Sequence, residues 1–149
     1  MNKILVIGGA GYIGGAISDI MKVSVFDNLM FEDRYFKPIT FYYGDVGNKD
    51  ELLHKTLAYD IVIVLAGLVG DPACQVDKKL TYDINVKHVK WLADNYPGKI
   101  VYTSSCSVYG KNDDLIDETA PPNPLSTYAE SKLMCEEILK DRPESLIYR

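Results

Sequence analysis

The hydrophobic residues of this chain fall into short unbroken runs that are separated by longer, mixed stretches. Uninterrupted runs of four to eight apolar residues are typical of strands buried on both faces of a parallel sheet. Six such strands are expected, at residues 4–7, 23–27, 39–43, 61–65, 99–104 and 146–148. The run at 61–65 is the most apolar of them, so we expect it at the centre of the sheet.

The stretches between these runs predict helices. The expected helices cover about residues 15–22, 49–57, 78–95 and 126–140. Within 78–95, apolar residues recur at helical spacing, and a Pro-Gly pair stops the pattern. Residues 28–37 have no clean period and are expected to form a loop over the site, and a proline-rich polar loop precedes the last helix.

Strands that alternate with helices predict an α/β fold built from βαβ units. If the crossovers are right-handed and reverse beside the first strand, the strand order is 3-2-1-4-5-6 in a mainly parallel sheet. The expected architecture is therefore a Rossmann-like three-layer αβα fold, and 149 residues suit one domain.

Composition narrows the function classes. A net charge of −5 argues against a nucleic-acid partner, because no basic stripe is present to neutralise phosphates. The apolar runs fall well short of the ~20 residues that span a bilayer, and the N-terminus runs directly into a strand, which favours a cytoplasmic protein without a signal peptide. Three widely spaced cysteines indicate neither a disulfide framework nor a metal site.

Glycines recur at Gly8, Gly11 and Gly14 directly after the first expected strand. Such a turn lets a pyrophosphate approach the backbone at the N-terminus of the next helix, and its last small residue lets that helix pack close to the strand. The second run ends in Asp27, 19 residues after Gly8, close to the ~20-residue offset of a carboxylate that binds an adenosine ribose. The pattern predicts a dinucleotide site, with NAD preferred over NADP because Asp27 would repel a 2′-phosphate.

A second cluster of polar residues follows the fifth run. Tyr128 and Lys132 are four residues apart on an expected helix, so they share one face. An ammonium near a phenol favours the phenolate, so we expect Lys132 to lower the pKa of Tyr128 and make it a general base. Ser105 lies at the carboxyl end of the fifth strand, where its hydroxyl would hold the same substrate oxygen.

Together these motifs resemble an extended short-chain dehydrogenase/reductase of the NAD-dependent epimerase/dehydratase family. The resemblance covers the whole chain and corresponds to about the amino-terminal two thirds of such an enzyme. It also includes Gly44-Asp45-Val46, Leu65-Ala66-Gly67, Asn85-Val86 and Val108-Tyr109-Gly110. One departure is the short interval of 13 positions from Gly14 to Asp27, which predicts a first helix about a turn shorter than usual.

The resemblance implies NAD as cofactor and assigns its contacts. Gly8, Gly11 and Gly14 form the turn, with Tyr12 and Ile13 at the pyrophosphate and Asp27 and Asn28 at the adenosine ribose. Asp45 and Val46 are expected beside the adenine, and Leu65, Ala66, Gly67 and Leu68 along the wall toward the nicotinamide ribose. Asn85 is expected near the cofactor. Ser105, Tyr128 and Lys132 match the catalytic residues, and Lys132 also bonds the nicotinamide ribose.

The leading hypothesis is a nucleotide-sugar epimerase-like oxidoreductase, in which Tyr128 takes a proton from a sugar hydroxyl. Two alternatives stay open: an NAD-binding module without its own turnover, which regulates or pairs with another chain, and a reductase or dehydrogenase. Residues 1–149 are expected to be the NAD-binding domain, without the substrate-binding region of the family. The chain is then either a truncated product or a free-standing cofactor half, and a homo-oligomer or a missing carboxyl-terminal half is the expected partner.

The residues after Ser105 bear on the reaction type. Family dehydratases carry acidic residues at the positions that match Cys106 and Ser107. Neither of these side chains is a carboxylate that could protonate a leaving hydroxyl. Epimerisation or simple redox chemistry is therefore expected, and elimination of water is not.

Overall fold

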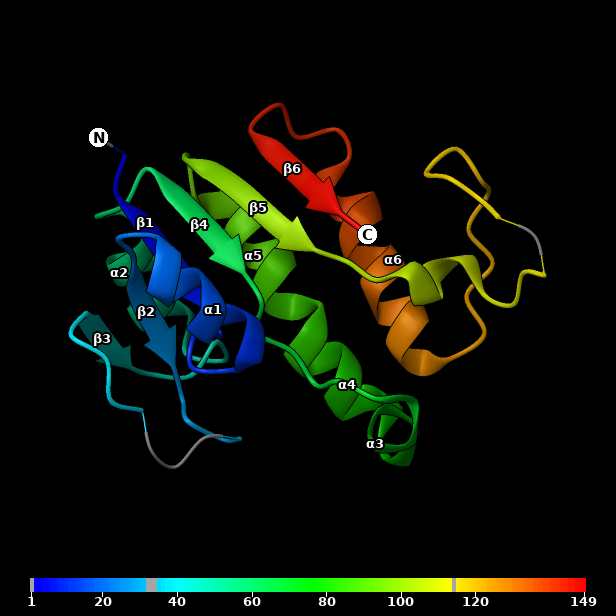
Figure 1. Ribbon diagram of the computed structural model, residues 1–149, viewed down its shortest axis with the longest axis horizontal. Helices are drawn as coiled ribbons and strands as arrows, with labels where there is room; N and C mark the ends of the chain where they lie inside the picture. Colours follow the sequence, from blue (N-terminus) through cyan, green and yellow to red (C-terminus); the bar gives the residue numbers. More distant parts are fainter. Residues whose placement is uncertain (1, 32–34, 114) are drawn as a thin grey trace.

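The computed structural model describes residues 2–31, 35–113 and 115–149 (Figure 1). Its core is a sheet of six strands in the order β3-β2-β1-β4-β5-β6, and every neighbouring pair is parallel. The strands are β1 (Ile4–Ile7), β2 (Ser24–Asp27), β3 (Thr40–Tyr43), β4 (Ile61–Val64), β5 (Lys99–Thr103) and β6 (Ser145–Tyr148). The predicted fold class and strand order are confirmed.

Six α-helices and one 3₁₀ turn connect these strands in the described residues. They are α1 (Tyr12–Ile20), α2 (Lys49–Thr56), α3 (Asp71–Val76), α4 (Lys78–Asn85), α5 (Lys87–Asn95), η1 (Cys106–Tyr109) and α6 (Thr127–Leu139). Helix α6 is capped by Ser126, whose hydroxyl accepts a hydrogen bond from the Ala129 amide at 3.2 Å, and this agrees with the helix predicted from about residue 126.

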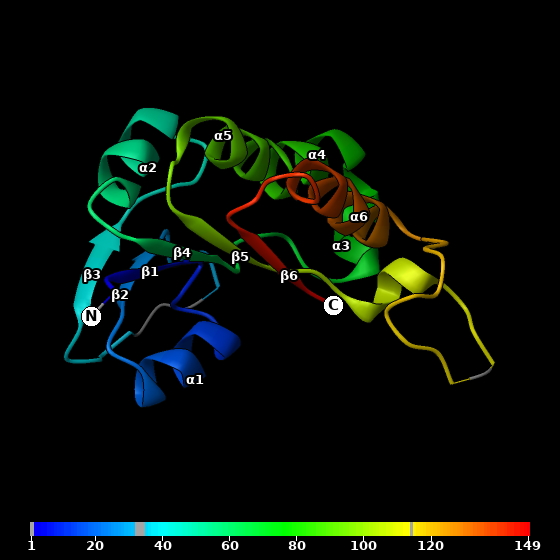
Figure 2. The same ribbon diagram turned by 90° about the horizontal axis from the view of Figure 1, so that it is seen from above.

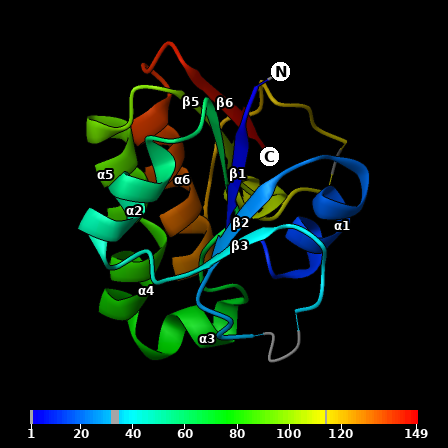
Figure 3. The same ribbon diagram turned by 90° about the vertical axis from the view of Figure 1, so that its left-hand side faces the viewer.

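The two faces of the sheet are covered unequally. Helices α2, α4, α5 and α6 pack on one face, and α1 lies alone on the other, below β1 and β2 (Figures 2 and 3). The larger core cluster lies under the group of four helices and contains fully buried side chains such as Leu5, Phe26, Val62 and Ile100. The smaller cluster lies on the α1 side, around Val6, Val23 and Val25. Three layers are therefore present, and the α1 layer is the thinner.

Several predicted boundaries are wrong. Helix α1 begins at Tyr12, three positions before the predicted start, because the glycine turn passes directly into the helix with Gly11 as its N-cap. The helix predicted over 78–95 is two helices that meet at Val86. At this break the Asn85 carbonyl accepts from the Cys135 thiol at 3.3 Å. The sequence analysis did not separate α3 or η1 from the loops, and within the expected 28–37 loop residues 32–34 lie outside the described residues.

Candidate cofactor and active site

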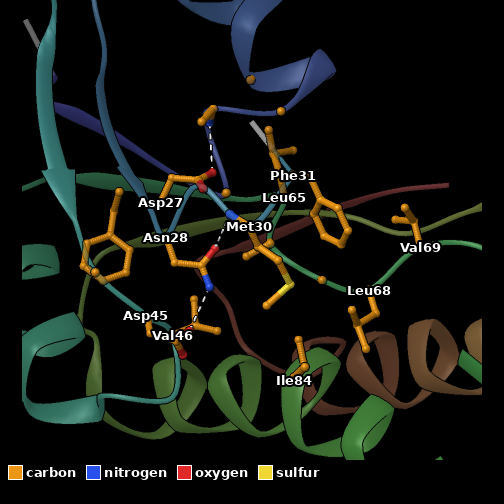
Figure 4. A pocket seen from close by; sticks show the side chains of 18 of the residues that line it. Asp27, Asn28, Met30, Phe31, Asp45, Val46, Leu65, Leu68, Val69 and Ile84 are labelled. Atoms are coloured by element: carbon orange, nitrogen blue, oxygen red, sulfur yellow. Dashed lines mark hydrogen bonds between the residues drawn. The ribbon is translucent and has the colours of Figure 1, made fainter. Parts of the chain in front are cut away.

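A cavity of about 570 Å³ opens at the carboxyl ends of β1, β2 and β4, the edge where open α/β sheets bind ligands (Figure 4). Five segments form its walls: the turn after β1, the loop after β2, the turn after β3, the loop after β4, and α4 at Asp83 and Ile84. Of the predicted cofactor residues, those that line it are Gly8, Gly11, Tyr12, Ile13, Gly14, Asp27, Asn28, Asp45, Val46, Leu65, Ala66, Gly67 and Leu68. The fold thus brings nearly the whole predicted set together.

The three glycines of the turn differ in how strictly the fold requires them. Gly8 has φ of +79°, and a Cβ there would meet the Ala66 amide nitrogen at 2.4 Å. A Cβ on Gly14 would meet the Gly9 Cα at 2.4 Å, so α1 can pack on the turn only without a side chain. Gly11 has ordinary dihedrals, and the nearest atom to a Cβ there is the Gly8 oxygen at 3.8 Å. The fold itself therefore does not require a glycine at position 11, where bare backbone lines the cavity.

The N-terminus of α1 faces the same cavity. No side chain caps its first amides, and its first turn carries no acidic residue. Uncapped amides and the helix dipole attract anions at a helix N-terminus. The turn is therefore suited to a pyrophosphate in shape and in charge.

Asp27 joins the glycine turn to the loop after β2. Its Oδ2 accepts a hydrogen bond from the Ala10 amide at 3.0 Å, and its Oδ1 accepts one from the Leu29 amide at 2.7 Å. Beside it, Asn28 Nδ2 donates to Asp45 Oδ2 at 2.8 Å, which fixes two further predicted cofactor residues to each other (Figure 4). The carboxylate thus lies at the cavity wall, where a ribose would lie.

Apolar side chains complete the cavity, and the sequence analysis missed several of them. Met30 and Phe31 follow Asn28 in the loop and remain 58% and 75% exposed. Figure 4 shows Phe31 between Met30 and Val69. The sequence signal that could have predicted them is a pair of large apolar residues in an otherwise irregular loop. Exposed apolar residues of this kind are typical of ligand-binding surfaces.

Asn85 differs from the other predicted cofactor residues, because its side chain does not line the cavity. The amide is buried behind the loop after β4, where it accepts from the Leu68 amide at 2.7 Å and donates to the Leu68 carbonyl at 3.1 Å. Its Nδ2 also lies 3.0 Å from Ser131 Oγ in α6. The structure therefore places Asn85 as a link between the cavity wall and α6.

Ser105, Tyr128 and Lys132 gather further along the same edge of the sheet, outside the lining of the cavity. Ser105 precedes η1, and its oxygen accepts from Ser107 Oγ at 2.7 Å. The neighbouring Ser105 side chain favours a lower pKa of the Tyr128 phenol. Lys132 Nζ lies 5.7 Å from the centre of the Tyr128 ring and donates to the Thr103 carbonyl at 2.9 Å.

The expected effect of Lys132 on Tyr128 is wrong in this structure. Burial raises the pKa of Tyr128 above its ordinary value, and this outweighs the lowering effect of Ser105. Burial also lowers the pKa of Lys132, whose ammonium is bonded to the Thr103 carbonyl. The geometry brings the three side chains together but leaves the phenol protonated at neutral pH.

The contacts of the other reactive or metal-binding residue types indicate no catalytic or metal-binding role. Cys74 is fully buried, and burial raises the pKa of its thiol, which agrees with a packing role. Across the described ranges no three His, Cys, Asp or Glu side chains gather in a metal-binding group. None of the helices described is long and apolar enough to cross a membrane.

Comparison with known proteins agrees with this geometry. Residues 4–145 match the profile of the family described as "NAD dependent epimerase/dehydratase family". The chain is 34% identical to a UDP-glucose 4-epimerase of Neisseria meningitidis serogroup C, over 95% of this chain and 48% of that protein. It is 33% identical to a UDP-glucose 4-epimerase of Streptococcus mutans serotype c, over 92% of this chain and 46% of that protein. The chain thus spans about half the length of the curated relatives it matches.

Solved structures show the same relationship. A UDP-glucose 4-epimerase from Brucella ovis in complex with NAD superposes with a TM-score of 0.85 and 27% identity, covering 99% of this chain and 52% of that one. A UDP-Glc/GlcNAc 4-epimerase from Campylobacter jejuni superposes with a TM-score of 0.86 at 24% identity, over 99% of this chain and 52% of that one, and this second likeness concerns the fold alone.

Proposed function

Because the chain belongs to the NAD dependent epimerase/dehydratase family, we propose that residues 1–149 are an NAD-binding domain that serves a nucleotide-sugar epimerase. The observation that carries the proposal is the cavity at the glycine turn. It combines uncapped amides at the start of α1, an open position at Gly11 and a carboxylate at Asp27. An elongated ligand with a pyrophosphate and a ribose would meet a matching group at each of these points.

The residues present fit NAD along its length. The amides at Tyr12 and Ile13 would hold the pyrophosphate, and Asp27 would accept bonds from the adenosine ribose. Val46 and Met30 offer apolar surface for the adenine, and both line the cavity. The loop from Leu65 to Leu68 would lead toward the nicotinamide ribose, and Lys132 would bond that ribose at the far end.

The second half of the proposal concerns the sugar. NAD, when bound, accepts a hydride from a sugar carbon and can return it. Tyr128 would take the proton from the hydroxyl on that carbon, and Ser105 would hold the same oxygen through its hydroxyl. Because burial raises the pKa of Tyr128, removal of its proton is the demanding step of the proposed reaction.

The reaction proposed is epimerisation, which agrees with the curated relatives named above. Cys106 is exposed beside Ser105, and the Ser107 hydroxyl donates a hydrogen bond to Ser105 Oγ. Neither group can act as a carboxylic acid toward a leaving hydroxyl, so elimination of water has no general acid here. A UDP-hexose is the substrate class we propose.

A second candidate function is an NAD-binding module without turnover of its own. It is favoured by one observation: the three proposed catalytic side chains lie outside the lining of the cavity, while nearly all the cofactor residues lie within it. In that case the chain would bind NAD and act through a partner.

The test is titration of the chain with NAD by calorimetry, followed by incubation with NAD and a panel of UDP-hexoses. We expect NAD binding, and conversion of one UDP-hexose to its 4-epimer that Tyr128→Phe abolishes. NAD binding without conversion would support the module, and absence of NAD binding would overturn both candidates. Loss of water from a sugar, detected by mass and abolished by Tyr128→Phe, would overturn the assignment of epimerisation.

A further inference from the structure

Lys132 is a buried cation with no anionic partner in the described part of the chain. Its side chain belongs to a residue only 5% exposed, and burial lowers the pKa of the amine. No ion pair found among residues 2–31, 35–113 and 115–149 includes it. Its hydrogen bond goes to the Thr103 carbonyl. A buried ammonium normally needs a countercharge or several hydrogen-bond acceptors. A further interaction must therefore stabilise the charged form of Lys132.

Two aromatic rings meet the ammonium from different elements. The nitrogen lies 4.9 Å from the centre of the Tyr102 ring on β5 and 5.7 Å from the centre of the Tyr128 ring on its own helix. Both distances are within the ~6 Å over which the negative face of a ring attracts a cation. Such contacts are strongest where water is excluded, and Tyr102 is 1% exposed.

The hydroxyl of Tyr102 gives no reason for a tyrosine rather than a phenylalanine at this position. Its oxygen is buried and has no hydrogen-bond partner, which is a cost that a phenylalanine would avoid. What Tyr102 contributes to Lys132 is therefore the face of its ring, which lies on the nearest strand and cannot move away.

The other titratable groups near Lys132 supply no negative charge. They come from three elements: Cys74 of α3, His88 of α5, and Tyr128 and Cys135 of α6. Burial raises the pKa of both thiols, that of Cys135 to about 11, and raises the pKa of Tyr128, so all three stay protonated at neutral pH. Burial lowers the pKa of His88 to about 4, so its imidazole is neutral.

We propose that Tyr102 is a positioning residue for Lys132: the face of its ring, together with the Thr103 carbonyl, holds the ammonium charged and aimed along the carboxyl edge of the sheet. The inference rests on the proposed function only for the task that it gives Lys132, which is to serve Tyr128 and a ribose. Tyr128 contributes the second ring, but its own protonation state would change during the proposed reaction. The ring of Tyr102 on β5 keeps the same charge distribution throughout.

The test measures the Lys132 amine directly, by NMR titration of protein labelled with ¹³C at the lysine ε carbon, the Lys132 signal being identified by its loss in Lys132→Arg. Tyr102→Phe keeps the ring face and should leave the pKa of Lys132 unchanged. A pentafluorophenylalanine placed at position 102 keeps the shape but reverses the charge distribution of the ring, and should lower that pKa by about one unit. Tyr102→Leu, which removes the ring, should lower it in the same direction.

The matched control is Tyr96→Leu, which removes a buried tyrosine of the same core cluster near the opposite end of β5. It should leave the Lys132 titration where it is. An unchanged pKa with the fluorinated ring, or an equal fall in Tyr102→Phe, would overturn the proposal, because the ring face would then not be the cause. Since the measurement needs neither NAD nor turnover, its result is separable from that of the proposed function.

Discussion

Gly11→Ala should impair NAD binding while sparing the fold. Position 11 has φ of −73° and ψ of −177°, which alanine adopts without strain, and the nearest atom to the new Cβ lies at 3.8 Å. Alanine is a poorer N-cap than glycine by about 1 kcal/mol or less, and the smaller entropy of the unfolded chain returns about 0.4–1 kcal/mol. The free energy of unfolding should therefore change by less than about 1 kcal/mol.

The effect on binding should be much larger. The methyl group would stand where the backbone must be approached closely, and overpacking of this kind costs about 1–3 kcal/mol, a loss of about fivefold to 150-fold in affinity. Calorimetric titration with NAD measures the affinity, and urea denaturation measures the stability.

Gly14→Ala is the matched control, because its Cβ would overlap the backbone of Gly9 at 2.4 Å. It should lower stability by about 1–3 kcal/mol or more. If Gly11→Ala binds NAD as tightly as the wild type, or if it loses as much stability as Gly14→Ala, the assignment of the open position to the cofactor is wrong.

Two further predictions follow from the same structure. NAD should bind more tightly than NADP, because the Asp27 carboxylate at the cavity wall repels a 2′-phosphate, and competition by calorimetry should show the preference shrinking in Asp27→Asn. His88 is neutral in the folded chain with a pKa of about 4, below its ordinary 6.5, so stability should be highest above pH 6.5 and fall by about 3 kcal/mol as the pH drops from 6.5 to 4. Urea denaturation across that range should show the fall in the wild type and a flatter profile in His88→Leu, and equal slopes would refute it.

The sheet could be predicted because its signals are local. Each strand is a short apolar run, and the order of strands then follows from the handedness of crossovers. The glycine turn and Asp27 were predictable for the same reason, since the spacing of a βαβ unit places them at one edge. The N-cap of α6 at Ser126 is also a local signal.

What could not be predicted depends on contacts between distant residues. The break at Val86 goes with an Asn85 carbonyl that meets Cys135, 50 positions away, and no helical periodicity records such a contact. The pKa of Tyr128 has the same origin: the spacing of Tyr128 and Lys132 indicates that they share a face but not that burial outweighs their attraction. Met30 and Phe31 were not predicted as cavity-lining residues, because an irregular loop has no hydrophobic period that would indicate which side chains face a cavity.

The side chain of Asn85 also limits how the site can open. Two of its hydrogen bonds hold the Leu68 backbone, and its Nδ2 also reaches Ser131, the residue before Lys132. Swinging the loop after β4 away from α4 and α6 would break the two bonds between Asn85 and Leu68, at about 1 kcal/mol for each bond and so about 2 kcal/mol in all. At equilibrium such an open state would hold only about 3% of the molecules. The cavity wall at Leu68 and helix α6, which carries the proposed catalytic side chains, therefore behave as one body, and a ligand must enter while this frame is closed.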